Sequence, residues 1–167
     1  DNVINADDRT FLGSPFPKYT YSLNTDLEYK NFDLSIFFQG VQDVQAVNGL
    51  KLTGLTASIQ GYNMLKDIQN AWSPENTSSS IPIISSSDNN KNFTTFSDFY
   101  VEDASYLRMK NITLGYTFSP NMFNKVFSKL RVFGSVDNVF TLTKYTGFDP
   151  EVGADRFGID IGRYPQA

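Results

Sequence analysis

The chain has 167 residues, with 14 basic and 18 acidic side chains and an aromatic content of 15%. The net charge of −4 disfavours nucleic-acid binding, because no basic run is present to neutralise phosphates. The absence of Cys and His excludes thiolate and imidazole metal sites and the commonest general base. No run of about 18 apolar residues occurs, so the sequence predicts no transmembrane helix.

The first strong pattern runs from residue 19 to 29, where aromatic or apolar side chains alternate with polar ones. A period of two over this length predicts a strand with one apolar and one wet face. Residues 32–38 continue the alternation after Lys30-Asn31. If that pair is a two-residue turn, Tyr29 lies opposite Phe32 and the apolar faces of both strands coincide. We therefore predict a β-hairpin.

A second pair of strands is predicted much later in the chain, over about 105–118 and 129–143. In the first of these, apolar residues alternate from Ile112 to Phe118, but residues 106–109 break the period, so that part of the strand is expected above any membrane. In the second, Phe133 opposes the face shared by its apolar neighbours. A β-bulge at Gly134 is one explanation of this irregularity.

The connections between the four strands (about 18–30, 32–41, 105–118 and 129–143) alternate between short and long. Outer-membrane barrels show this alternation, with short periplasmic turns and longer extracellular loops. The strands also have the length that a tilted membrane strand needs, about 9–11 residues. The pattern favours such a barrel, with extracellular loops at about 1–17, 42–104 and 144–163. A soluble sandwich with one large insertion is the alternative.

The longest connection contains a stripe of apolar residues at helical spacing, which predicts one short amphipathic helix. We expect this stripe to pack the loop onto the barrel rather than to bind a ligand. Its members are Ile59, Tyr62, Leu65, Ile68 and Trp72.

Five blocks of the sequence, in the same order, resemble the SusC/RagA family of TonB-dependent outer-membrane transporters. Together they cover almost the whole chain, which makes the resemblance far more specific than any single block. The blocks are GSPFPKYTYSLNTDLEYKNFDLSIFFQG (13–40), AWSPENTSSSIP (71–82), SYLRMKNITLGYTF (105–118), DNVFTLTKYTGFDPEV (137–152) and GIDIGRYPQ (158–166).

The resemblance implies an all-β fold, namely the C-terminal strands of an antiparallel transmembrane β-barrel of about 22 strands with long extracellular loops. Members of the family end in one further strand with a terminal aromatic residue, and this chain stops at Ala167 before it. The plug domain and the TonB box of the family are absent from the sequence. On this interpretation all 167 residues belong to the C-terminal part of the barrel.

The resemblance also implies a function, which is energised uptake of oligosaccharides or peptides across the outer membrane of a Gram-negative bacterium. The implied partners are the remainder of the barrel and its plug, a SusD-like surface lipoprotein, TonB acting through the missing N-terminal part, and outer-membrane lipid. No cofactor, no metal, no catalytic residue and no nucleic-acid partner are expected, so the chain is not predicted to be an enzyme.

Three sets of candidate site residues follow from the alternation and from the loop assignment. The residues predicted to face the lumen, where they contact substrate or the plug, are Asn24, Asp26, Glu28 and Ser35. Those predicted to face lipid are Tyr21, Leu23, Leu27, Tyr29, Leu34 and Ile36. Those predicted in extracellular loops are Trp72, in the loop at about 42–104, and Tyr145, Asp149 and Glu151, in the loop at about 144–163. Asp155 and Arg156 also lie in the loop at about 144–163.

A soluble β-rich glycan-binding module is the competing function, with aromatic residues such as Tyr62 and Trp72 stacking on sugar rings. Such a module should bury the apolar face of residues 19–29 inside its own pair of sheets, whereas a transporter turns that face to lipid. A glycosidase is a weaker option, because no pair of carboxylates stands out as acid and nucleophile.

Overall fold

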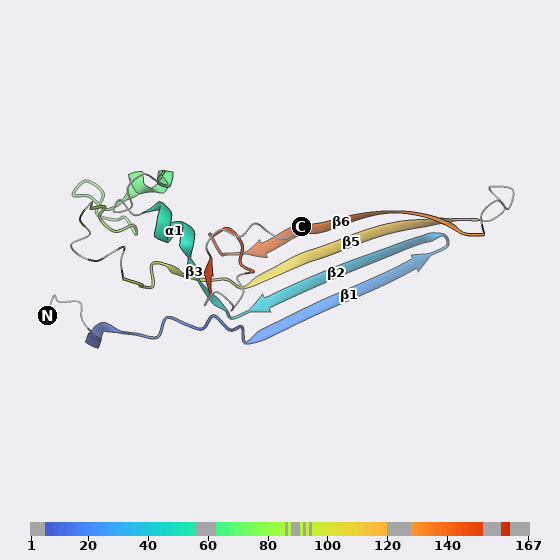
Figure 1. Cartoon of the computed structure of the whole chain (residues 1–167), viewed down its shortest axis with the longest axis horizontal. Coiled ribbons are helices and arrows are strands. Elements are labelled where there is room, and N and C mark those ends of the chain that lie inside the picture. Colours follow the sequence, from blue (N-terminus) through green and yellow to red (C-terminus); the bar gives the residue numbers. More distant parts are fainter. Residues whose placement is uncertain are drawn as a thin grey trace. The chain divides into compact units, whose positions relative to one another are not determined.

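The computed structural model describes residues 6–55, 63–85, 87, 91, 93, 95–119, 128–151 and 158–160. The chain divides into two compact units (Figure 1). The strand unit comprises Pro17–Asp43 and the described residues of Ser105–Lys144; the loop unit comprises the described residues within Asp1–Phe16, Val44–Ala104 and Tyr145–Pro165. Within the described ranges, no helix has the length and apolar character required to cross a membrane.

The strand unit is a single antiparallel sheet in the order β1-β2-β5-β6 (Figure 1). Its strands have between 11 and 14 residues each. They are β1 (Tyr19–Tyr29), β2 (Phe32–Gln42), β5 (Tyr106–Phe118) and β6 (Leu130–Thr143).

The hairpin of β1 and β2 has the register that the sequence predicts. Tyr29 pairs with Phe32 and Leu27 pairs with Leu34, so the apolar sides of both strands lie on one face. Lys30 in the turn adopts a positive φ of 56°. The carbonyl of Asn31 accepts a bond of 2.8 Å from the backbone N–H of Thr117, which joins this turn to β5.

The irregularity in the second pair of strands lies elsewhere than predicted. The pairing of β5 shifts between Met109 and Asn111, which leaves Lys110 as the extra residue relative to β2. Two residues of β6, of which Asn138 has a φ of 50°, lie opposite Lys110. Asn enters the left-handed region more readily than most residues, so it suits a bulge. The bulge also explains why the period breaks at residues 106–109.

The predicted bulge at Gly134 is therefore wrong. Gly134 pairs with Leu114 in an uninterrupted stretch of the ladder, and Phe133 pairs with Gly115. Phe133 opposes its apolar neighbours simply because it belongs to the polar face of the sheet.

The loop unit contains a second, three-stranded sheet in a region predicted as loop. Its order is β4-β3-β7, from β4 (Val101–Asp103), β3 (Gln45–Asn48) and β7 (Ile159–Asp160). The β3–β4 pair is antiparallel, whereas the β3–β7 pair is parallel. The α-helix α1 (Gly49–Gly54) follows β3 directly, and the side chain of Asn48 caps it by accepting from the N–H groups of Leu50 and Lys51.

The predicted amphipathic helix has a different form in the described residues. Within the stripe, the structure has the 3-10 helix η2 (Lys66–Asn70), while α1 lies earlier in the same connection. A further 3-10 turn, η1, spans Ala6–Asp8 near the start of the chain. Leu65 and Ile68 pack against the small core of Leu55, Phe93 and Tyr100. Their spacing thus reflects packing within the loop unit itself. Ile59 and Tyr62 lie outside the described residues.

Candidate functional site

The register of the strand unit gathers apolar side chains from all four strands on one face. The described residues leave this face largely uncovered: Leu23 in β1 is 59% exposed and Val132 in β6 is 58% exposed. A single-layer sheet with an exposed apolar face is unusual in a water-soluble protein. The members of this apolar face include Leu23, Leu27, Leu34, Ile36, Ile112, Leu114, Val132 and Val136.

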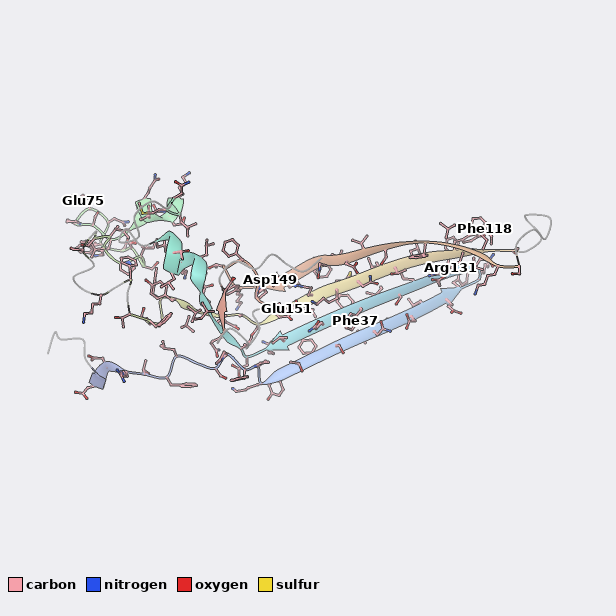
Figure 2. The ribbon with its side chains drawn as sticks, in the orientation of Figure 1. Phe37, Glu75, Phe118, Arg131, Asp149 and Glu151 are labelled. Atoms are coloured by element: carbon pink, nitrogen blue, oxygen red, sulfur yellow. The ribbon has the colours of Figure 1, made fainter. Side chains whose placement is uncertain are left out.

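Aromatic rings border this face at the end where β1 turns into β2. The rings of Phe32 and Tyr116 have centroids 4.7 Å apart, and those of Tyr116 and Phe118 are 4.8 Å apart. Lys30 places its ammonium 5.2 Å from the ring centroid of the adjacent Tyr29. Figure 2 shows Phe118 and Arg131 at this end of the sheet.

Further aromatic rings lie on the apolar face between its middle and the opposite end. Phe38 and Phe140 lie 6.4 Å apart between ring centroids. The ring of Tyr21 covers Gly40 on the neighbouring strand so closely that a Cβ on Gly40 would lie 2.1 Å from it. The apolar face between the two aromatic rows carries mainly aliphatic residues.

The other face of the sheet carries polar side chains that are hydrogen-bonded to one another, both along one strand and between neighbouring strands. Asn24 donates to Asp26 at 2.9 Å. Asn111 in β5 donates to Asp137 at 2.7 Å and to Ser135 at 2.8 Å, both in β6. These bonds hold the polar groups of neighbouring strands in defined positions.

An ion pair bridges three strands on this polar face near the turns. Arg131 in β6 donates from Nε to the carboxylate of Asp33 in β2 at 3.0 Å and pairs with it through a second nitrogen. Both side chains pass over Gly115 in β5, where a Cβ would lie 2.5 Å from each. The guanidinium also lies 5.0 Å from the ring centroid of Phe133.

In the loop unit, the carboxylate of Glu102 in β4 is the centre of a network. It accepts from Asn48 at 2.9 Å and from the backbone N–H of Thr146 at 2.9 Å, and it forms an ion pair with Lys51 at 2.8 Å. Burial alone would raise the pKa of Glu102, but the hydrogen bonds from Lys51, Asn48 and Thr146 outweigh it, so the pKa is lowered.

A second carboxylate, Asp160 in β7, is buried and holds the turn that follows β6. It accepts from the hydroxyl of Tyr145 at 3.0 Å and from the backbone N–H groups of Phe148 at 2.8 Å and Asp149 at 3.3 Å. Burial, together with the charge of Asp160 and its neighbouring carboxylates, raises the pKa of Tyr145, so the phenol stays protonated as a donor.

Two curated receptors are similar to this chain over nearly its whole length. TonB-dependent receptor P3 of Formosa agariphila is 34% identical over 172 residues, which cover 97% of this chain and 16% of the receptor. TonB-dependent receptor SusC of Bacteroides thetaiotaomicron is 30% identical over 169 residues, covering 100% of this chain and 16% of SusC. No family model matches the chain.

The solved structure of the RagAB peptide importer in its closed-closed state matches with a TM-score of 0.80 and 26% identity, over 99% of this chain and 18% of the importer chain. The chain belongs to the SusC/RagA family of TonB-dependent transporters. Its antiparallel strands correspond to part of the β-barrel of this family. The chain spans only about a sixth of the length of the curated relatives that it matches.

The residues predicted to face the lumen lie together on the polar face of this barrel segment. Asn24, Asp26 and Glu28 alternate along β1, and Asp26 pairs with Ser35 in β2. The residues predicted to face lipid occupy the apolar face, on the same two strands: Tyr21, Leu23, Leu27, Tyr29, Leu34 and Ile36. The faces are distinct in the structure, and their assignment to lumen and lipid stays a prediction.

The residues predicted in extracellular loops divide into two groups. Tyr145 and Asp149 are buried and meet at Asp160, and Glu151 donates its backbone N–H to Asp149 at 2.9 Å (Figure 2). Trp72 belongs to a different turn, where its backbone N–H donates to Ile81 at 2.9 Å. Asp155 and Arg156 lie outside the described residues.

The two carboxylates that organise the loop unit, Glu102 and Asp160, are not among the residues predicted from the sequence. Neither has a local signal, since their partners are far away in the sequence. Asn48, a buried polar residue that donates to Glu102, does have one, because an Asn directly before a helix is a favoured N-cap. Within the described parts of the chain, no cluster of three or more metal-ligating side chains is found.

Proposed function

We propose that this chain forms part of the wall of an outer-membrane transporter that imports oligosaccharides or peptides with energy delivered through TonB. A SusD-like surface lipoprotein covers its outer opening, and the barrel and plug of the full receptor complete the transport path. The names of the relatives support this proposal: two are TonB-dependent receptors, and the solved structure is a peptide importer. The chain is assigned no catalytic role.

The observation that carries the proposal is the exposed apolar face between two aromatic rows. The 11 residues of β1 have Tyr19 and Tyr29 at their ends, and they extend about 33 Å along the strand. At the strand tilt of roughly 40° common in membrane barrels, this length covers about 25 Å of depth, which is the height of the apolar band in such barrels.

The soluble glycan-binding module fits these observations less well. That alternative requires the face of β1 that carries Leu23 and Tyr29 to be buried in a closed core. Instead, Leu23 is 59% exposed and Tyr29 is 70% exposed. In water such a surface would be unfavourable, whereas in a bilayer it is solvated by lipid tails.

The arrangement of connections supports one orientation of the barrel segment. The turn of β1 and β2 lies at the end of the sheet where β5 ends and β6 begins (Figure 1). The longer connections all leave from the other end, since Tyr19 pairs with Gln42 and Tyr106 pairs with Thr143. Because membrane barrels have short periplasmic turns, the residues of about 1–17, 42–104 and 144–163 are assigned to the cell exterior.

Because the apolar face contacts lipid in this proposal, the polar face lines the interior of the barrel. Asn24, Asp26, Glu28 and Ser35 then contact water, the plug or the passing substrate. The hydrogen bond from Asn24 to Asp26 and the bonds of Asn111 to β6 are those of a hydrated inner wall.

Site-specific labelling tests the assignment of faces. The chain contains no Cys, so Leu27→Cys and Glu28→Cys introduce single thiols on adjacent residues of opposite faces, in a full-length receptor whose other cysteines are replaced by serine. We expect a membrane-impermeant aqueous maleimide to react with Glu28→Cys and a lipid-soluble maleimide to react with Leu27→Cys. The reverse pattern would refute the proposal.

Uptake measurements test the transport activity itself. Cells that produce the full-length receptor with its lipoprotein should accumulate fluorescent oligosaccharides or peptides only when TonB is present. Equal uptake in a strain without TonB would contradict energised import, and an absence of lipoprotein in the purified complex would contradict the proposed partner.

A further inference from the structure

Phe37 is an aromatic residue in the middle of the polar face of the sheet. It pairs with Asn24 in β1 and with Asn111 in β5, both of which belong to that face. Its neighbours Ile36 and Phe38 pair with residues of the apolar face. Figure 2 shows Phe37 about midway along β2. The polar face therefore carries an aromatic ring near the middle of β2.

Hydrogen-bonding side chains flank this ring on both sides and are held in place by other bonds. On one side, Asn24 donates to Asp26 at 2.9 Å. On the other side, Asn111 donates to Asp137 at 2.7 Å. Directly paired residues have Cβ atoms about 4.5–5.5 Å apart. The side-chain amides of Asn24 and Asn111 are therefore close enough to the ring of Phe37 to contact the same sugar ring.

The ring of Phe37 is half-buried, and in the described part of the chain it stacks on no other ring and no cation lies over it. Phe133, the other aromatic residue named on this face, differs in this respect. The guanidinium of Arg131 lies 5.0 Å from its ring centroid. Phe37 thus offers an unoccupied ring face, whereas that of Phe133 already has a partner.

The chemistry around Phe37 fits a polyhydroxylated ring. The negative face of an aromatic ring attracts the polarised C–H groups of a sugar ring, and amide and carboxylate groups at its edges bond to hydroxyls. The core of a protein–protein interface is instead depleted of charged residues, while carboxylates of Asp26 and Asp137 lie on either side here. A peptide or protein segment is therefore the less suitable occupant.

We propose that Phe37, flanked by Asn24 and Asn111, forms a sugar-binding subsite on the inner face of the barrel wall, with Phe37 as the stacking platform. The subsite rests on the proposed function, because it requires the polar face to line the interior. Of the two substrate classes in the proposed function, oligosaccharides and peptides, the subsite selects the oligosaccharides.

Calorimetric titration of the purified full-length receptor tests the subsite, with maltohexaose, cellohexaose and xylohexaose as probes and a mixed hexapeptide pool as the comparison. We expect at least one hexasaccharide to bind and Phe37→Ala to weaken that binding roughly tenfold or more. Phe37→Trp should retain binding because it keeps an aromatic platform. Phe133→Ala is the matched control and should stay within about twofold of the unmodified receptor.

Three results would overturn the subsite: no hexasaccharide binds, Phe37→Ala binds as well as the unmodified receptor, or only the hexapeptide pool depends on Phe37. Labelling of Ser35→Cys, which lies on the same face, separates this failure from that of the proposed function. If aqueous maleimide reacts with Ser35→Cys, only the sugar subsite fails. If only the lipid-soluble reagent reacts, the assignment of the polar face to the interior of the barrel is refuted as well.

Discussion

Asp33 and Arg131 form an ion pair that crosses the intervening strand β5 above Gly115. The two residues are not on adjacent strands, so their side chains meet only because Gly115 leaves the space between them empty. A Cβ at this position would lie 2.5 Å from the guanidinium and from the carboxylate. The glycine is thus a packing requirement of the ion pair, at a backbone position that other residues could also adopt.

Gly115→Val is expected to destabilise the barrel because the new side chain displaces the ion pair above it. Overpacking of a filled site typically costs about 1–3 kcal/mol. The measurement is the temperature at which the full-length receptor loses its folded mobility on a gel in detergent, and this temperature should fall.

Gly134→Val is the matched control, because a Cβ at Gly134 meets nothing within 4 Å. It should leave the unfolding temperature nearly unchanged, or raise it slightly, since valine favours strands. If both valine variants behaved alike, the ion pair would not depend on the empty position at Gly115.

Leu23→Arg should impair assembly of the receptor in membranes, because a charge on the lipid face near the midplane costs about 2–4 kcal/mol. Asn24→Arg places the same charge one residue later on the polar face and should have a much smaller effect. The amount of heat-modifiable folded receptor in outer-membrane fractions measures both. A larger defect from Asn24→Arg would reverse the assignment of faces.

The hydrogen bonds to Glu102 predict a pH dependence of the loop unit. Its pKa is lowered in the folded state from an ordinary value of 4.5. A carboxylate with a depressed pKa stabilises the folded state above its unfolded pKa, and this contribution disappears as the pH falls through the folded value. The network should therefore be intact at neutral pH and weaken below about pH 4.5.

Glu102→Gln tests this dependence, because it keeps the shape of the side chain and removes its charge. Hydrogen exchange at the amide of Thr146, which donates to Glu102, should be faster in the variant than in the unmodified receptor at pH 7. The difference between the two proteins should shrink as the pH is lowered below about 4.5. A difference that stayed constant over this range would exclude ionised Glu102 as its source.

Much of the strand unit follows from the sequence because its signals are local. The period of two in β1 and the two-residue turn after Tyr29 together leave one register that aligns both apolar faces. The same alternation separates the polar residues of the candidate site, such as Asn24 and Asp26, from the apolar face. Asn138 at the bulge is also a readable signal, since Asn tolerates a positive φ.

The loop unit does not follow from the sequence because its pairings are distant and short. Val47 in β3 pairs with Ile159 in β7, and the two strands have four and two residues. Strands of this length show no measurable alternation. Glu102 and Asp160 acquire their roles only when these strands meet, so nothing near them in the sequence marks them as the centres of networks.

Asp160→Ala should release the turn after β6, because it removes the acceptor of the Tyr145 hydroxyl and of the N–H groups of Phe148 and Asp149. Leaving buried donors without a partner costs about 1–3 kcal/mol. Hydrogen exchange at the amides of Phe148 and Asp149 should accelerate accordingly. Tyr145→Phe removes one of the three bonds and should accelerate exchange less; an equal effect of both variants would place the main support of the turn in Tyr145 rather than in Asp160.

The 167 residues produced alone are expected to aggregate in plain buffer and to require detergent. In the described structure β1 pairs only with β2 and β6 only with β5, so the sheet has two open edges. Open edges and a large uncovered apolar face both favour association with other chains. Sedimentation of the refolded chain with and without detergent measures this behaviour. A monodisperse monomer in plain buffer that melts cooperatively would instead show that the apolar face is covered in solution, and the soluble glycan-binding module would then replace the barrel segment as the better interpretation.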